Sequence, residues 1–337
     1  MPSSPAVSSR VLSPPEVLSR FLRRVLQEQG AAQDELAADT VHDLRVALRR
    51  CRSLAEGFAE LDGHREWRQL RKVARRLQRG LAQLRDAQVM AGWVRRLGFT
   101  GAAGTPGSAV AASLRGDERK ARRAARNALA DFSRKRWKRW RQRLPQRAGR
   151  LAENPSAFAD LALRRASEAA ALERRWRRGG SQLAAHRLRI AVKRFRYTVE
   201  SFLPEQYAVW GRNLRRMQDC LGEIHDLDVL RGRILQLAKE ESFSRQTLRA
   251  WLRQMEGVRR ERVERYRKAV SATRKSARRG TRTPVLWDLW SRELYSMAWI
   301  NPPKSAAASG SEASATGLPA EKTAARRGTQ LPPSSAA

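Results

Sequence analysis

Two histidines of this chain are each followed three residues later by an arginine, at His42 and Arg45 and at His186 and Arg189. On a helix of about 100° per residue, further cations at similar spacing fall on the same side as each histidine. These two cationic stripes are His42, Arg45, Arg49 and Arg52, and His186, Arg189, Lys193 and Arg196. Guanidinium and imidazole groups in such a row can donate hydrogen bonds to phosphate oxygens, so the stripes are candidates for binding a polyanion.

A run of charge on a helix is usually a solvated face. Such faces normally mix both signs, because like charges one turn apart repel each other. Each stripe here is cationic over about three helical turns and largely lacks acidic partners, while a neighbouring face is apolar, as at Leu44, Leu48 and Cys51. Repulsion that is present in both segments indicates an anionic ligand that relieves it.

The two stripes belong to a longer internal match. Residues 41–58 (VHDLRVALRRCRSLAEGF) align without gaps on residues 185–202 (AHRLRIAVKRFRYTVESF), with eight identities. Residues 81–90 (LAQLRDAQVM) match residues 221–230 (LGEIHDLDVL) in the same order, again about 140 residues apart. We interpret the chain as two copies of one helical unit, with the boundary near residues 151–157, where a proline-containing break precedes the second copy.

Each copy has further cations just before its LxxLRD or LxxIHD element. These residues extend the predicted basic surface: Lys72, Arg75 and Arg76 in the first copy, and Arg212, Arg215 and Arg216 in the second. Asp86 and Asp226 are acidic in both copies, and we expect them to cap a helix or to hold an arginine in place. His64 and His225 have no histidine counterpart in the other copy, so we expect local structural roles for both.

The same residues argue against metal binding and catalysis. Each stripe histidine is followed by an arginine, whose charge raises the cost of binding a divalent cation, so we expect no metal and no other cofactor. The chain has no GxxxxGK[ST] loop, no HExxH pair and no credible Ser/His/Asp set. We therefore expect a binding protein rather than an enzyme.

The composition agrees with an anionic partner. The 337 residues include 69 Lys and Arg against 33 Asp and Glu, a formal charge of +36 that would strongly self-repel without one. Charge alone leaves nucleic acid, polyphosphate, an acidic membrane face and an acidic protein open. Cys51 and Cys220 occupy apolar-periodic stretches and are typical of core residues in a reducing compartment. No apolar run approaches the roughly 18 residues that span a bilayer, so we expect a cytoplasmic protein without membrane attachment.

The elements that carry the stripes are predicted to be helices throughout. Apolar residues recur at helical spacing through most of residues 17–274, which predicts an all-α fold, and 41% hydrophobic residues suffice for a core. We expect a folded region at residues 15–300, made of repeats at about 15–150 and 155–300, with disordered tails at 1–14 and 301–337. The expected helix breaks are residues 100–108, 145–155, 179–180, 204 and 280–284.

With these motifs in hand, the sequence resembles the CHAD family of conserved-histidine α-helical domains. The motifs are HDLRVALRRCR at residues 42–52, HRLRIAVKRFRY at 186–197, LRD at 84–86 and LGEIHDLDVL at 221–230. The resemblance implies two pseudo-symmetric four-helix bundles around a basic central groove or pore, binding of inorganic polyphosphate and, in some members, attachment to polyphosphate granules. The family's basic positions fall on His42, Arg45, Arg49, Arg50 and Arg52, and on His186, Arg189, Lys193, Arg194 and Arg196.

The chain also departs from the family's larger architecture. Some members carry a triphosphate-tunnel (CYTH) domain marked by ExExK, but no two glutamates of this chain are separated by a single residue, so we expect the stand-alone form. The leading hypothesis is thus non-catalytic polyphosphate binding, with possible targeting to granules. An alternative is nucleic-acid or general polyanion binding, since RKRWKRWR at residues 134–141 interleaves Trp137 and Trp140 with cations, as a base-stacking platform would. The same spacing also suits two core anchors on one helix face. A polyphosphatase is a third hypothesis.

Overall fold

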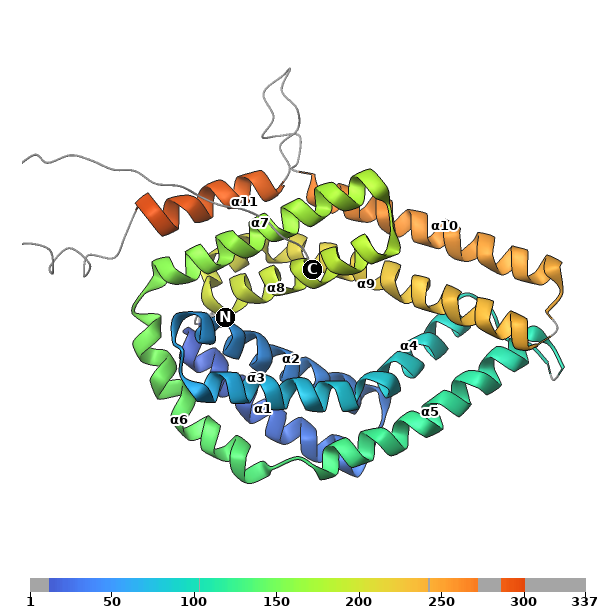
Figure 1. Cartoon of the computed structure of the whole chain (residues 1–337), viewed down its shortest axis with the longest axis horizontal. Coiled ribbons are helices and arrows are strands. Elements are labelled where there is room, and N and C mark those ends of the chain that lie inside the picture. Colours follow the sequence, from blue (N-terminus) through green and yellow to red (C-terminus); the bar gives the residue numbers. More distant parts are fainter. Residues whose placement is uncertain (1–11, 103, 242, 272–285, 301–337) are drawn as a thin grey trace, which may run out of the picture. The chain divides into compact units, whose positions relative to one another are not determined.

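The computed structural model describes residues 12–102, 104–241, 243–271 and 286–300, all of which belong to one compact unit. These residues form eleven α-helices and one π-helical turn, so the predicted all-α fold is confirmed (Figure 1). The helices are α1 (Pro14–Asp34), α2 (Ala38–Leu61), α3 (Arg65–Gly80), α4 (Ala82–Arg96), α5 (Pro106–Ala130), α6 (Arg134–Ala152), α7 (Pro155–Gly179), α8 (Gln182–Phe202), α9 (Pro204–Glu240), α10 (Arg245–Val270) and α11 (Leu286–Tyr295), with the π-helical turn at Ser296–Ile300. The predicted tail at 301–337 lies outside the described residues, and so does that at 1–14 apart from residues 12–14, where α1 already begins at Pro14.

The helices of the two halves have neighbours in a similar order. In the first half α1 packs on α2 and α6, α2 packs on α3, and α4 packs on α5. In the second half α7 packs on α8 and α11, α8 packs on α9, and α9 packs on α10. The single long helix α9 stands where the first half has α3 and α4, which are separated at Leu81. An internal duplication remains our interpretation of this order.

Local signals explain where the helices that carry the stripes begin and end. The Ser181 side chain accepts a hydrogen bond from the Ala184 amide and so caps α8, after Gly180 (φ 60°) has ended α7 in the left-handed conformation that favours glycine. Pro204 starts α9, where its missing N–H costs nothing. The expected breaks at 179–180 and 204 are thus confirmed, and that at 280–284 lies outside the described residues.

The expected break at 145–155 is present only at its end, between Ala152 and Pro155, because Pro145 itself lies inside α6. Proline removes one backbone hydrogen bond from a helix interior. Leu144 and Ala148 on either side of Pro145 are fully buried, so the apolar side of α6 continues across the proline. Packing of this side offsets the local cost, and the chain turns only after Ala152.

The two tryptophans of α6 belong to the core. Trp137 and Trp140 are 1% and 0% exposed, and their rings meet edge to face at 5.4 Å between centroids. They are therefore the core anchors that their spacing indicated, and the alternative of a base-stacking platform is wrong. The two cysteines, Cys51 and Cys220, are also buried and form no disulfide.

Replacing Trp140 by alanine should lower the free energy of unfolding by about 3–5 kcal/mol, because it removes a fully buried indole and leaves a cavity. Urea denaturation measures the change. The neighbouring Arg139 is exposed, and its replacement by alanine should stay within about 0.5 kcal/mol of the parent. A small effect of both substitutions would contradict the core role of Trp140.

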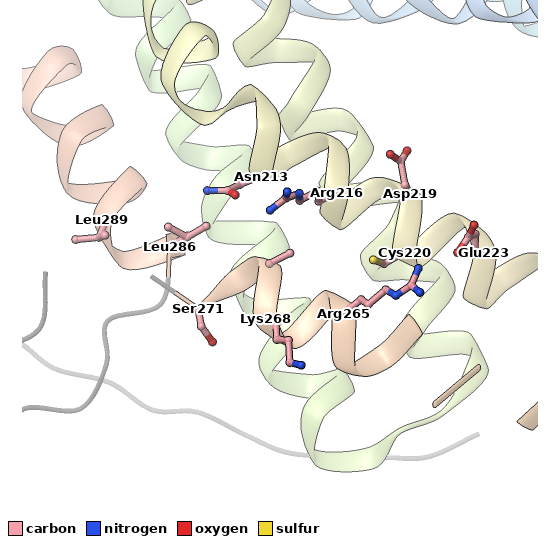
Figure 2. Close-up of a pocket in the computed structure, with 11 residues that line it drawn as sticks. Asn213, Arg216, Asp219, Cys220, Glu223, Arg265, Lys268, Ser271, Leu286 and Leu289 are labelled. Atoms are coloured by element: carbon pink, nitrogen blue, oxygen red, sulfur yellow. The ribbon is translucent and has the colours of Figure 1, made fainter. Parts of the chain in front are cut away.

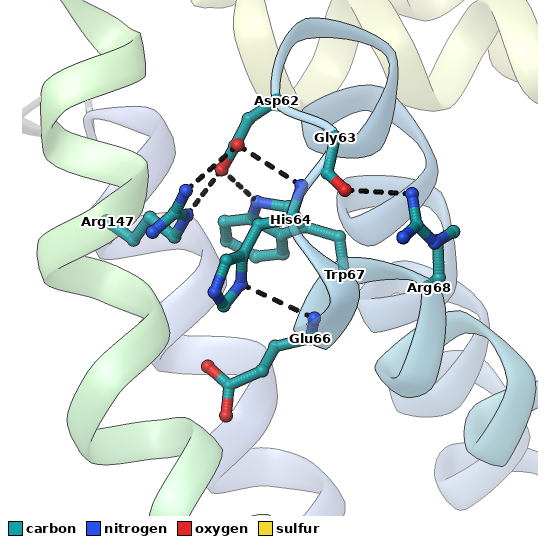
Figure 3. Close-up of polar contacts among 7 residues, drawn as sticks. All are labelled: Asp62, Gly63, His64, Glu66, Trp67, Arg68 and Arg147. Carbon is teal, nitrogen blue, oxygen red and sulfur yellow. Dashed lines mark hydrogen bonds and ion pairs between the residues drawn. The ribbon is translucent and has the colours of Figure 1, made fainter.

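Asp62 joins three helices at the end of α2 (Figure 3). Its carboxylate accepts hydrogen bonds from Trp67 Nε1 of α3 at 2.9 Å, from the His64 amide at 3.2 Å and from Arg147 of α6. The Arg147 hydrogen bond lowers the pKa of Asp62 to about 2. His64 Nδ1 accepts from the Glu66 amide at 3.4 Å, so this histidine has the local structural role that we expected. The contacts fix α3 and α6 against the end of α2.

A search of the described helices for a membrane span is negative, since none combines the necessary length with the necessary apolar character.

Candidate anion-binding site

Residues of both cationic stripes line a single cavity, whereas Arg52 of the first stripe and His186, Lys193 and Arg196 of the second lie outside its lining. Helix α2 packs directly on α8, and α4 packs on α9, so the stripe-bearing helices lie side by side (Figure 1). The cavity between these four helices has a volume of about 210 Å³. Its walls are His42, Arg45 and Arg49 of α2, Arg85, Asp86, Val89 and Met90 of α4, Arg189 of α8, and His225, Asp226 and Val229 of α9. Cations from segments more than 140 residues apart therefore line one space.

Two of these arginines have hydrogen-bonding capacity that is not used. The Nε atoms of Arg49 and Arg189 are buried and have no hydrogen-bond partner among the described residues. Arg45 is held more firmly, because its guanidinium donates to the Gln78 carbonyl oxygen at 2.7 Å. A buried donor without a partner is costly, and a ligand oxygen in the cavity would offset that cost. The arrangement suits an anion with several acceptor oxygens.

The lowered pKa of Lys193 reflects how closely the cations of α2 and α8 approach one another. Burial lowers its pKa to about 7, and repulsion from Arg189, Arg49, Arg52 and Arg194 contributes to the shift. Arg49 and Arg52 belong to α2, whereas Arg189 and Arg194 belong to α8. The two stripes thus form one continuous electropositive cluster, which favours a polyanion over a single small anion.

Three histidines lie at this cluster, and sequence reasoning identified only two of them as site residues. His186 of α8 and His225 of α9 have ring centroids 4.9 Å apart. Burial lowers the pKa of His42 and of His186, and it lowers that of His225 to about 4, with repulsion from Arg189 contributing. His225 therefore lines the cavity as well as packing locally, which corrects our expectation. In the internal sequence match His225 aligns with Arg85, which also lines the cavity. Two basic residues at this matched position were the signal that could have identified His225 and Arg85 as site residues.

Asp86 and Asp226 place two carboxylates in the wall of the basic cavity. Burial raises the pKa of both groups, while the nearby Arg45 and Arg189 oppose the shift. Both carboxylates thus partly offset the charge of cavity arginines. The expectation that they hold an arginine in place stays a prediction. Among the described residues, no three His, Cys, Asp or Glu side chains are grouped as ligands for a metal ion.

Arg50 does not line the cavity, which corrects our assignment of this residue to the site. It is 8% exposed, forms an ion pair with Glu200 of α8 and lies 4.4 Å from the centroid of the Tyr197 ring. The physical reason is helical rotation, because position 50 is turned by about 100° from position 49 and faces the packing side of α2. Arg196 pairs with the same carboxylate at 3.4 Å, and the more exposed Arg194 pairs with Glu56 at 3.2 Å.

The six cations predicted to extend the basic surface are all exposed, but they do not line the cavity. On α3 these are Lys72, Arg75 and Arg76, and on α9 they are Arg212, Arg215 and Arg216. Arg75 lies close enough to Arg52 to contribute to its lowered pKa, behind burial and the opposing Glu56. The others have different surroundings, since Arg76 pairs with Asp131 at 2.8 Å and Arg215 donates to Tyr207 at 2.9 Å.

Arg216 lines a different cavity, of about 640 Å³, formed by α9, α10 and α11 (Figure 2). Its wall carries the carboxylates of Asp219 and Glu223 as well as Arg265 and Lys268, and its apolar surface includes Leu286 and Leu289. Both cavities have two wall carboxylates, but the larger one sets only three cations against them, whereas the basic cavity sets four arginines and two histidines against Asp86 and Asp226. The larger cavity is therefore the poorer anion site.

A family model for the CHAD domain matches residues 16–235, which is more than half of the chain. The chain belongs to the CHAD domain family. The match covers α1 to α8 and most of α9, so it contains both cationic stripes and the whole lining of the basic cavity.

A solved structure agrees with the family's fold. The crystal structure of the CHAD domain from the plant Ricinus communis is 21% identical in sequence, with a TM-score of 0.57. The alignment covers 82% of this chain and 98% of the plant chain. A comparison with curated proteins finds no match. The fold of this CHAD domain is therefore shown by two comparisons, while the ligand of its cavity is argued from the residues that line it.

Proposed function

We propose that this CHAD protein binds inorganic polyphosphate without catalysis, in the cavity between α2, α4, α8 and α9. The observation that supports the proposal is one cavity lined by arginines of both halves, in which the buried Nε atoms of Arg49 and Arg189 are free to donate. Each phosphate unit of a polyphosphate chain brings a charge and several acceptor oxygens to such donors. Binding releases counterions, so its affinity should fall steeply with salt.

The dimensions of the cavity favour a single phosphate chain over a nucleic acid duplex. A volume of about 210 Å³ is small even beside the roughly 300–1,000 Å³ of ordinary small-molecule sites. A nucleic acid duplex is too wide to enter a cavity of this size. The lining also contains no Trp, Tyr or Phe ring on which bases could stack. A thin, densely charged phosphate chain fits a small cavity and needs no stacking surface.

A competition assay at fixed ionic strength tests the proposal. A labelled polyphosphate complex is challenged with equal phosphate equivalents of unlabelled polyphosphate, DNA or RNA. We expect unlabelled polyphosphate to displace the label at much lower concentration than either nucleic acid. Equal displacement by all three would sink the specific proposal and leave a general polyanion binder.

The affinity for long-chain polyphosphate should decrease as pH rises from about 7 to 9. The pKa of Lys193 is about 7 in the free protein, and a bound anion raises it because it favours the ammonium form. Above pH 7 binding must therefore take up a proton, and log affinity should fall by up to about one per pH unit. Fluorescence anisotropy titrations over this pH range measure the slope.

The matched control is Lys193→Arg, because a guanidinium keeps its charge throughout this range. We expect its affinity to be nearly constant between pH 7 and 9, where the internal phosphates of a long chain also stay ionised. The groups that face Lys193 in the cluster include Arg49 and Arg52 of α2 and Arg189 and Arg194 of α8. An unchanged slope in Lys193→Arg would assign the proton uptake to another group.

Polyphosphate binding of this kind would also bring the protein to polyphosphate granules. A fluorescent fusion should form foci in cells that synthesise polyphosphate and remain diffuse in cells that cannot. A fusion carrying Arg45→Glu and Arg189→Glu should be diffuse in both. Foci formed by that variant would mean that granule recruitment does not use the cavity.

A further inference from the structure

A second basic surface lies on helices that do not touch the cavity. Residues 106–152, which include α5 and α6, contain fifteen Lys and Arg but only three acidic residues. None of the cavity-lining residues comes from α5 or α6, although α5 packs chiefly on the outside of the lining helix α4, while α6 packs chiefly on α1. We call the exposed Lys and Arg of these two helices the α5–α6 face. The polyphosphate proposal does not account for this charge.

The three acidic residues of this region are already engaged. Asp117 pairs with Arg233 of α9 at 2.7 Å, Glu118 with Arg122 at 2.8 Å, and Asp131 with Arg76 of α3 at 2.8 Å. Most cations of the α5–α6 face are therefore exposed without a carboxylate partner among the described residues. On α6, Lys135, Arg139 and Arg143 follow one another at a spacing of four residues, on the side opposite the buried tryptophans.

The corresponding helices of the second half differ. Helices α10 and α11 carry ten Lys and Arg with five acidic residues, so their surfaces mix both signs as ordinary solvated faces do. Three exposed arginines of α10 can serve as controls when charges on α6 are changed, namely Arg249, Arg253 and Arg260. Among the helices that the structure describes, the excess of cations over carboxylates is thus larger on α5 and α6 than on α10 and α11.

We propose that the α5–α6 face binds the phosphodiester backbone of duplex nucleic acid, independently of base sequence. Helix α5, with 25 residues, is about 37 Å long, which spans many phosphates of a duplex at about one charge per 1.7 Å. Trp137 and Trp140 are buried, so the face has no stacking platform of the kind used to bind single strands. Backbone neutralisation by exposed Arg and Lys is the contact mode that remains. The protein would then hold a polyphosphate chain and a duplex at separate surfaces.

The test combines three variants of the full chain with two probes. The first variant carries Lys135→Glu, Arg139→Glu and Arg143→Glu; the second carries Arg249→Glu, Arg253→Glu and Arg260→Glu and has the same net charge. The third is the cavity variant with Arg45→Glu and Arg189→Glu. Affinities for a short random-sequence DNA duplex and for polyphosphate are measured at several salt concentrations, and circular dichroism checks the fold of each variant.

We expect the α6 variant to lose at least about 10-fold in duplex affinity, with a salt slope shallower by about three, while its polyphosphate affinity changes little. The cavity variant should lose polyphosphate affinity, while its duplex affinity changes little. Equal duplex losses in the α6 and α10 variants would overturn the proposal in favour of a net-charge effect. Tighter binding of a single-stranded probe, or displacement of the duplex by polyglutamate as readily as by unlabelled duplex, would also overturn it. Since each surface has its own probe, failure of the polyphosphate proposal is distinguishable from failure of this one.

Discussion

Replacing Arg45 and Arg189 together by glutamate should lower polyphosphate affinity by more than about 100-fold, since loss of one buried charge contact typically costs about 2–5 kcal/mol. The two residues come from α2 and α8 and line the same cavity. Both are partly buried, and burial lowers the pKa of Arg45 to about 10 and that of Arg189 in the same direction. A glutamate at either position would add a carboxylate to a wall that already contains Asp86 and Asp226. Fluorescence anisotropy or calorimetry measures the loss.

The matched control for this prediction is Arg139→Glu with Arg143→Glu, which changes the net charge by the same amount at exposed positions of α6. We expect its polyphosphate affinity to stay within about threefold of the parent, because only long-range, salt-screened attraction is lost. Similar losses in both double variants would mean that the stripes are part of a general electrostatic surface and do not form a site.

Replacing Glu200 by glutamine should destabilise the fold by about 3–5 kcal/mol, the cost of leaving buried charges unpaired. The Glu200 carboxylate is shared by Arg50 of α2 and Arg196 of α8, whose side chains are only 10% and 11% exposed. Without the carboxylate, two largely buried guanidinium groups would face each other around the Tyr197 ring. Urea denaturation monitored by circular dichroism gives the change in unfolding free energy.

The control for Glu200 is Glu168→Gln on α7, which removes the same charge from an exposed position and should stay within about 0.5 kcal/mol of the parent. If Glu200→Gln lowered the free energy of unfolding as little as the control does, Arg50 and Arg196 would have to contact solvent or other partners in its place.

The periodicity of the sequence predicted the all-α fold class correctly for local reasons. Each apolar position of α2 and α8 fixes which side of its helix is buried, and the cavity residues Arg45, Arg49 and Arg189 follow from that. The same reasoning cannot show which residues of other helices each face packs against. That Arg50 packs against Glu200 and Tyr197 depends on contacts about 150 residues apart in the chain.

Two other residues show where local signals fail. Pro145 is a strong helix breaker by itself, but the buried Leu144 and Ala148 keep α6 continuous across it. His225 lacked a histidine counterpart and so did not resemble a site residue, although its aligned partner Arg85 lines the same cavity. In both cases tertiary packing decided the outcome. That residues of both stripes line one cavity could be established only once α2 was placed against α8.

The central claim is that both halves of the chain contribute to one phosphate-binding cavity. Calorimetric titration of the protein with a short polyphosphate of defined length tests it most directly, using the parent chain and the single variants Arg45→Glu and Arg189→Glu. A shared cavity predicts one chain bound per protein and a severe loss of affinity in each single variant. Two equivalent binding events per protein, with each variant removing one and leaving the other intact, would contradict it.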